Sequence, residues 1–228
     1  MPKINMPKSS PSIDMTPMVD LAFLLVTFFM LSANFRSNEV VAVDTPSSIS
    51  EAAIPENVIM VTVDKGGRIF FGMSGNETVK ASLLSGVAEQ FGMKFTKKEV
   101  EEFSRLTDFG CKLEELPTYL ALTPDERKKF VSEGKTMGIP ADSSNNQLKS
   151  WITYGNREAL KAGEVSYTKA LERGLNAEVN DFKPKFILKV DGKAAYLHAK
   201  QVIEVFRDLK LNNLNFVTSL EADPRKTL

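Results

Sequence analysis

The chain has 228 residues, and its 29 lysine and arginine residues balance its 29 aspartate and glutamate residues. Proteins that bind nucleic acids normally carry a basic excess, so the zero net charge argues against a nucleic acid as partner. The only cysteine, Cys111, excludes an intrachain disulfide, and the only histidine, His198, excludes a histidine-based metal cluster. We therefore expect no metal and no other cofactor, a buried structural role for Cys111, and a surface or half-buried position for His198.

The N-terminal part of the chain predicts a short tail followed by a transmembrane helix. Residues 1–13 are rich in proline, serine and lysine and suggest a mobile tail. Between Ile13 and Phe35, the run from Met18 to Leu31 is apolar except at Asp20 and Thr27, and a helix from Pro17 to Phe35 would be about 28 Å long, close to the thickness of the hydrocarbon core. Thr16 is a plausible N-cap, and Pro17 suits a first helical turn. We predict the transmembrane helix at residues 14–36.

One acid, Asp20, interrupts this apolar run. A carboxylate inside a membrane costs about 2.5–3.5 kcal/mol, so such acids usually face other proteins or a water path. Asp20, Thr27 and Asn34 are spaced seven residues apart and would share one face of the helix. This polar face predicts protein neighbours within the membrane. Thr27 could position a water molecule there, or donate to the carbonyl four residues before it.

Two other interpretations of this segment stay open. In a cleaved secretory signal, Lys3 and Lys8 would form the charged region and Leu21–Leu31 the apolar region, although an acid is unusual there. In a plain anchor, Asp20 would lie at the headgroup level, because it follows Pro17 by only three residues. Lys3 and Lys8 outweigh Arg36 on the other side, which favours a cytoplasmic N-terminus and places the bulk of the chain outside.

The segment Asp14-Met15-Thr16-Pro17-Met18-Val19-Asp20, followed by Leu21–Met30, resembles the ExbD/TolR family of biopolymer-transport proteins. In that family a T-P-x-x-D segment opens the only transmembrane helix, and its aspartate carries protons. The resemblance implies a bacterial inner-membrane protein, single-pass, with its C-terminal domain in the periplasm. It also implies a homodimer inside a ring of ExbB/TolQ-like subunits, with a TonB-like or TolA-like energy transducer as partner. The proton carrier would be Asp20, and the supporting pore-facing residues would be Thr16, Pro17, Thr27 and Asn34.

Residues 37–57 predict a short strand and a linker. The β-type run consists of Glu39, Val40, Val41, Ala42 and Val43, and residues 45–57 are rich in serine, proline and alanine. The resemblance implies that residues 39–43 pair with the other subunit or with a partner peptide as an added edge strand. An ordinary edge strand within the chain is an equal alternative.

A hairpin follows the linker. Val58–Val63 is rich in β-branched residues, Ile69–Gly72 is its partner, and Gly66 and Gly67 in the turn between them can adopt positive φ.

Residues 76–183 predict a mostly helical insertion. Capping boxes start at Thr96 and Thr123, with Glu99 and Glu126 three residues later. A third helix starts at Leu148 and could run to Leu160, and a weaker fourth spans Ser166–Leu175, with Gly163 as a break between them.

The last section predicts a strand at Phe186–Val190, an amphipathic helix at Tyr196–Lys210 and a strand at Leu214–Leu220 with one buried face, followed by a tail at 222–228. These elements should form a right-handed parallel unit. With the hairpin, they predict an α+β domain built from residues 58–75 and 184–221, a small sheet with helices on one face. The same two blocks resemble the periplasmic domain of the ExbD/TolR family, which lacks a long insertion.

The resemblance implies a proton-channel or motor subunit that converts proton motive force into energy for outer-membrane transport. A membrane-anchored periplasmic module that binds peptidoglycan or a partner protein, without moving protons, is the alternative. A flagellar-stator subunit would need a further peptidoglycan-binding domain, for which the residues after Leu220 leave no room. We expect no enzymatic activity, because the sequence has no nucleophile elbow, Gly-rich phosphate loop or metal-ligand spacing.

Overall fold

The computed structural model describes residues 16–32, 47–48, 57–142, 145–174, 176–217 and 219–220. The chain divides into two units, Met1–Ser37 and Asn38–Leu228. The first unit contains one described element, helix α1 (Thr16–Ser32), which covers most of the predicted helix at 14–36. Within the described ranges, no helix is both long and apolar enough to cross a membrane.

The second unit is an α+β domain around a mixed five-stranded sheet with the order β4-β3-β2-β5-β6. Strands β2 (Val58–Val63) and β3 (Ile69–Met73) are antiparallel, which confirms the predicted hairpin. In its turn, one carboxylate oxygen of Asp64 accepts from the backbone N–H groups of Gly66 and Arg68 at 2.9 and 2.8 Å. Gly67 adopts a φ of 80°, the left-handed conformation that glycine tolerates.

The C-terminal part forms the predicted strand, helix and strand. Strand β5 (Lys185–Val190) is parallel to β2, and helix α7 (Tyr196–Asp208) leads to β6 (Leu214–Val217), which is parallel to β5. Strand structure is confirmed for the described residues of the predicted strand at Leu214–Leu220, but they belong to two strands, and the predicted buried face is wrong. Strand β6 ends at Val217, and Phe216 is 58% exposed because β6 is the outermost strand of the sheet.

A second, two-stranded sheet joins distant parts of the chain. Strand β7 (Ser219–Leu220) is parallel to β1 (Ser47–Ser48), with Ser47 opposite Ser219. The predicted linker at 45–57 therefore contains a short strand.

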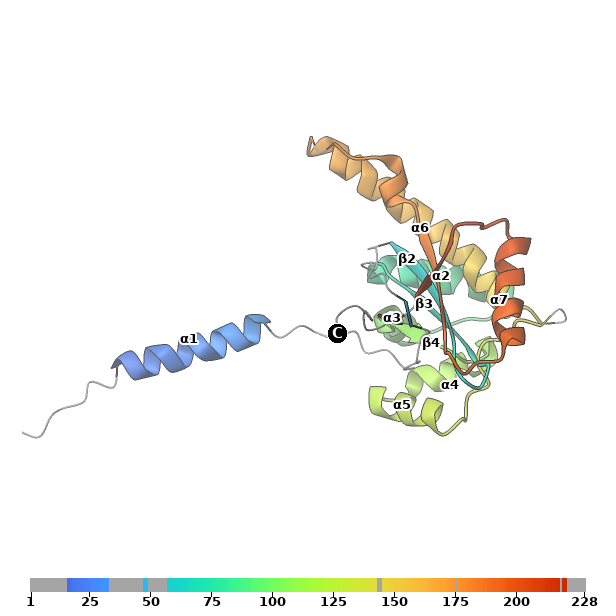
Figure 1. Ribbon diagram of the computed structural model, residues 1–228, viewed down its shortest axis with the longest axis horizontal. Helices are drawn as coiled ribbons and strands as arrows, with labels where there is room; N and C mark the ends of the chain where they lie inside the picture. Colours follow the sequence, from blue (N-terminus) through green and yellow to red (C-terminus); the bar gives the residue numbers. More distant parts are fainter. Residues whose placement is uncertain are drawn as a thin grey trace, which may run out of the picture. The chain divides into compact units, whose positions relative to one another are not determined.

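Helices fill the region between the hairpin and β5 (Figure 1). Both predicted capping boxes are present, at Thr96 with Glu99 and at Thr123 with Glu126. The predicted break at Gly163 is wrong, because one helix of 26 residues runs through it. The elements are α2 (Glu77–Gln90), α3 (Lys97–Arg105), β4 (Asp108–Phe109), η1 (Leu113–Glu115), α4 (Leu116–Ala121), α5 (Pro124–Ser132), α6 (Gln147–Glu172) and η2 (Val179–Phe182).

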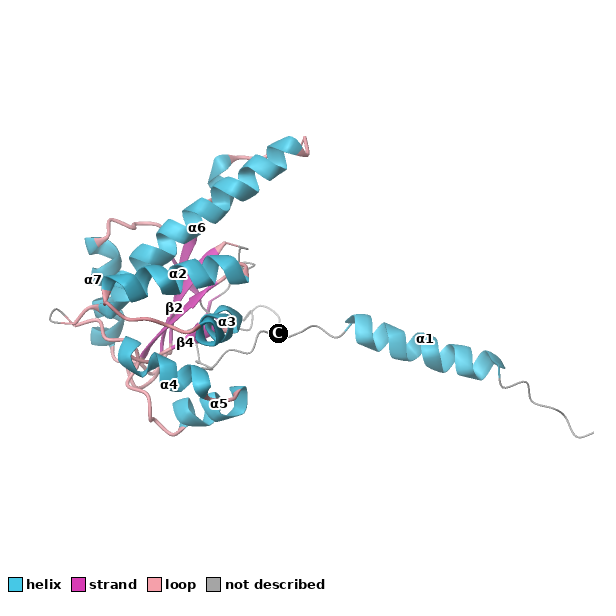
Figure 2. Cartoon of the chain, turned by 180° about the vertical axis from the view of Figure 1, so that it is seen from behind, coloured by secondary structure: helices cyan, strands magenta, loops and turns pink. Residues whose placement is uncertain are grey.

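The helices and the sheet share one hydrophobic core. Trp151 of α6 is fully buried, and its ring centroid lies 6.0 Å from Phe71 of β3 and 5.8 Å from Phe103 of α3. On the same face of the sheet, Phe186 of β5 contacts Phe206 of α7 with a centroid distance of 5.6 Å. Figure 2 shows α2 and α6 in front of the strands. Helices from residues 76–183 therefore pack directly on the hairpin.

Candidate functional site

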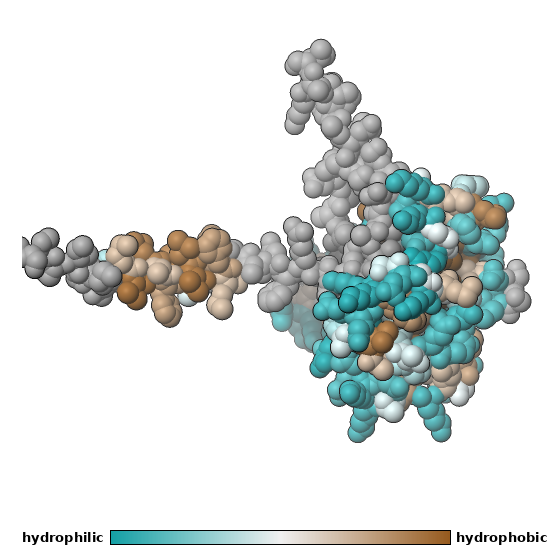
Figure 3. Space-filling view, turned by 90° about the horizontal axis from the view of Figure 1, so that it is seen from below, coloured by the Kyte–Doolittle hydropathy of each residue, from teal (hydrophilic) through white to brown (hydrophobic). Residues whose placement is uncertain are grey.

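Helix α1 exposes its apolar side chains from Met18 to Met30 (Figure 3). Ten large apolar side chains are each 56–76% exposed, which leaves them available to an apolar environment or to other proteins. They are Met18, Val19, Leu21, Phe23, Leu24, Leu25, Val26, Phe28, Phe29 and Met30.

Asp20 lies on this helix and is also exposed. Thr27, seven residues later, is about 10 Å further along the axis and shares the face of Asp20. The Thr27 hydroxyl donates to the Leu24 carbonyl at 2.9 Å, a bond to the third preceding residue and not to the fourth. A hydroxyl held in this way keeps its acceptor lone pairs free for a water or a neighbouring side chain.

The other predicted site residues at the membrane end are placed as follows. Thr16 is the first residue of α1, so Pro17, which is exposed, takes the second helical position. Asn34 lies outside the described residues, as does the predicted pairing strand at 39–43.

Cys111 and His198, the only cysteine and the only histidine of the chain, both lie in the domain. Cys111 is fully buried, and burial raises the pKa of its thiol, with the nearby Glu115 carboxylate adding to the shift, which confirms the expected buried thiol. His198 is half-buried, and its ring lies so close to Gly67 that a Cβ there would collide with it. Among the described residues, no three His, Cys, Asp or Glu side chains are grouped as a metal site requires.

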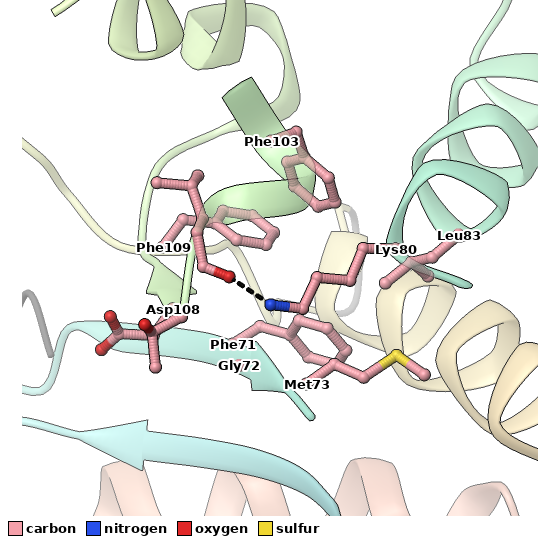
Figure 4. Close-up of a pocket in the computed structure, with 10 residues that line it drawn as sticks. Phe71, Gly72, Met73, Lys80, Leu83, Phe103, Asp108 and Phe109 are labelled. Carbon is pink, nitrogen blue, oxygen red and sulfur yellow. Dashed lines mark hydrogen bonds between the residues drawn. The ribbon is translucent and has the colours of Figure 1, made fainter. Parts of the chain in front are cut away.

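A small pocket near the aromatic core contains Lys80 (Figure 4). Its ammonium group donates to the Leu106 carbonyl at 2.6 Å, beside Phe71, Phe103 and Phe109. Burial lowers the pKa of Lys80, and the Glu77 carboxylate opposes this shift. The amine therefore joins α2 to the loop before β4.

Sequence reasoning missed Asn57, which it assigned to the linker. The Asn57 side-chain amide donates to the carbonyls of Ala159 and Phe182 at 3.3 and 2.9 Å. The available signal was weak: an amide residue directly before a β-branched run.

Comparison with known proteins identifies one family. A family model described as "Biopolymer transport protein ExbD/TolR" matches residues 6–221. The match includes α1, the hairpin, the C-terminal strands and the helical residues between them. Among curated proteins and among solved structures, none matches the chain.

Proposed function

The chain belongs to the ExbD/TolR family of biopolymer transport proteins, and on this premise we propose that it is the proton-carrying subunit of an inner-membrane motor complex. The complex converts proton motive force into energy for outer-membrane transport. Asp20 carries the protons, and Pro17, Thr27 and Asn34 support it along the same helix.

The observation that carries the proposal is the surface of α1. Ten large apolar side chains, each at least 56% exposed, surround a helix that has one carboxylate, Asp20. Apolar surface of this extent on a soluble protein marks an interaction with a membrane or another protein. We propose that α1, continued to Phe35, is a single membrane span with its N-terminus in the cytoplasm. A helix from Pro17 to Phe35 would be about 28 Å long, which suits the hydrocarbon core.

The surroundings of Asp20 follow from its charge. A carboxylate facing lipid is costly, so Asp20 faces protein or water inside the membrane. In the proposed complex, a ring of ExbB/TolQ-like subunits supplies that surface and encloses two copies of this chain. The domain from Val58 onward lies in the periplasm and passes force to a TonB-like or TolA-like protein.

The mechanism uses the two charge states of Asp20. When ionised, the carboxylate is held by polar neighbours or water, and when protonated, it can move against apolar surface. One elementary charge that crosses the membrane releases about 2.3 kcal/mol per 100 mV. Alternating protonation therefore changes which ring surface the helix contacts, and the membrane potential drives the change in one direction. Thr27 can hold a water molecule next to this path with its free lone pairs.

The proposal is tested with Asp20→Asn in the assembled complex in membranes. Asparagine keeps the shape of the side chain but cannot ionise. We expect proton flux and energised transport to be lost while the complex still assembles, and Asp20→Glu to retain part of both. Wild-type transport in Asp20→Asn would refute proton carriage and favour a membrane-anchored binding module. Deletion of residues 76–183 cannot make this distinction, because Trp151 and its neighbours belong to the core of the sheet.

A further inference from the structure

We infer that Asn57 is a positioning residue, through which force that reaches the domain from α1 along the chain is passed to a projecting arm of the domain. The arm consists of residues 160–174 and 176–183, which are the second half of α6, the turn after it and η2. This inference rests on the proposed function, because it assigns a route for force from α1 into the domain.

Asn57 binds three separate segments at the start of β2. Its side-chain nitrogen donates to Ala159 O of α6 at 3.3 Å and to Phe182 O of η2 at 2.9 Å. Its own carbonyl accepts from the backbone N–H of Lys185 at 2.9 Å, at the start of β5. One residue therefore joins the sheet to both sides of the arm.

The arm is built around the same junction. Figure 1 shows α6 running beyond the sheet, with η2 lying beside it. Gly163 lies against Phe182 O so closely that a Cβ would collide with that oxygen, and the same Cβ would lie 3.5 Å from the Asn57 side-chain nitrogen. The Tyr167 and Phe182 rings are in edge contact, with centroids 5.9 Å apart. Contacts at the base of the arm therefore converge on Asn57.

The position of Asn57 in the chain makes it part of the load path. Among the described residues between α1 and the five-stranded sheet, the paired strand is β1, and β1 and β7 have only two residues each. Strand β2 lies between β3 and β5 and pairs with them over five and six residues. Asn57 precedes this strand directly, so the load enters the sheet and the arm at one point.

The chemistry of the junction requires an amide. Two carbonyl oxygens converge on one nitrogen, and the NH2 group of asparagine offers two N–H donors. An aspartate at this position has no donor, and its carboxylate would face two carbonyl oxygens. Asn57→Asp thus removes both bonds and adds repulsion with almost no change in shape. Asn57→Ser has a shorter side chain, whose hydroxyl lies further from the two carbonyl oxygens, but it adds no negative charge and should give an intermediate effect.

The experiment compares Asn57→Asp and Asn57→Ser with wild type in the full chain, assembled in membranes. Asn213→Asp is the matched control, because it makes the same change at an exposed loop position. Hydrogen exchange is measured for the amides of the arm and of β2 and β3, and proton flux and energised transport are measured on the same samples. We expect Asn57→Asp to raise exchange in the arm at least about tenfold, since two bonds are lost, with little change in β2 and β3.

We also expect Asn57→Asp to reduce transport several-fold while proton flux persists, which a merely structural role would not produce. Unchanged protection of the arm, or wild-type transport with a loosened arm, would overturn the inference. Loss of protection throughout β2 and β3 in both Asn57 variants would also overturn it, because Asn57 would then stabilise the whole domain. These results are independent of Asp20→Asn, whose failure would refute the proposed function instead.

Discussion

Gly163 in the middle of α6 lies directly against the carbonyl oxygen of Phe182 in η2, with no room for a Cβ between them. The closeness of this contact allows the chain to return along the helix after its C-terminal end at Glu172. Gly163 is buried, although glycine is a poor helix former.

Replacement of Gly163 by alanine should therefore destabilise the arm even though alanine favours a helix by about 1 kcal/mol. The added methyl group would push Phe182 away and weaken the bond from Asn57. We expect faster amide exchange in residues 176–183 and a thermal midpoint lowered by a few degrees. Ser166→Ala is the control. Ser166 is exposed on the same helix, so alanine at this position raises the helix propensity without a steric clash. A midpoint for Gly163→Ala at or above that of Ser166→Ala would contradict this prediction.

This glycine also shows where sequence reasoning failed. A glycine between two apolar periodic segments suggests a break, and only the tertiary approach of Phe182 shows that the glycine is needed inside a continuous helix. The role of Asn57 was missed for the same reason, since its hydrogen-bond partners Ala159 and Phe182 are 102 and 125 residues away in the chain.

Features with local causes were predictable. The two capping boxes need only a threonine and a glutamate three residues later, and both formed as predicted. The hairpin followed from its β-branched strand and its glycine turn. The alternation of apolar and polar residues in the last strand predicted a buried Phe216, but this side chain is 58% exposed, because the alternation does not show which strand is outermost. For the candidate site, the sequence predicted a helix with Asp20 and Thr27 on one face, and both residues lie on α1. The neighbours that we propose for Asp20 belong to other chains, so this sequence alone cannot describe them.

A second prediction concerns Trp151, the only tryptophan of the chain. Its ring stacks on Phe103 and meets Phe109 edge-on at 4.8 Å, while its indole N–H makes no hydrogen bond within the described residues. Trp151→Ala should lower the free energy of unfolding by about 3–5 kcal/mol, because it leaves a large cavity. Trp151→Phe should cost much less, since it removes an unpaired buried donor together with part of the ring.

Urea unfolding followed by circular dichroism measures both variants of Trp151. Leu160→Ala is a suitable control, because Leu160 of the same helix is 39% exposed and should cost far less than Trp151→Ala. Equal losses for Trp151→Phe and Trp151→Ala would show that ring packing is not the main contribution.

A third prediction concerns Arg127, whose guanidinium group is almost fully buried. It donates to the carbonyls of Tyr119 and Leu120 at 3.2 and 2.7 Å and to Glu102 at 3.2 Å. The guanidinium group therefore supplies donors to two backbone carbonyls at the C-terminal end of α4 and links α4 to α3. Arg127→Met should lower the free energy of unfolding by about 3 kcal/mol, because both carbonyls and the Glu102 carboxylate lose their donor.

Lys128→Met is the matched control for Arg127→Met. Lys128 is the next residue of α5 and is exposed, so the same loss of a positive charge should change stability little. The contrast between the two variants, measured by chemical unfolding at one pH and salt concentration, isolates the buried contacts. A similar loss in both would assign the effect of Arg127 to net charge and not to its hydrogen bonds.

The last prediction concerns the pH dependence of the capping box at Glu126. The backbone N–H and the hydroxyl of Thr123 donate to one carboxylate oxygen of Glu126 at 2.8 and 2.7 Å. The backbone bond first, and then the hydroxyl bond, hold the pKa of Glu126 below its usual value of 4.5. The unfolded chain therefore binds more protons than the folded one between the two pKa values, so this contribution is complete above pH 4.5 and lost as the pH falls through the folded pKa.

Glu126→Gln tests this, because glutamine can accept the same bonds but does not titrate in this range. Wild type should have the higher thermal midpoint at neutral pH, and the difference between the two proteins should shrink towards zero on acidification. Glu101→Gln, at an exposed position of α3, should show no such convergence beyond the effect of net charge. A difference between wild type and Glu126→Gln that stays constant from neutral to acidic pH would show that the charge of Glu126 does not stabilise the cap.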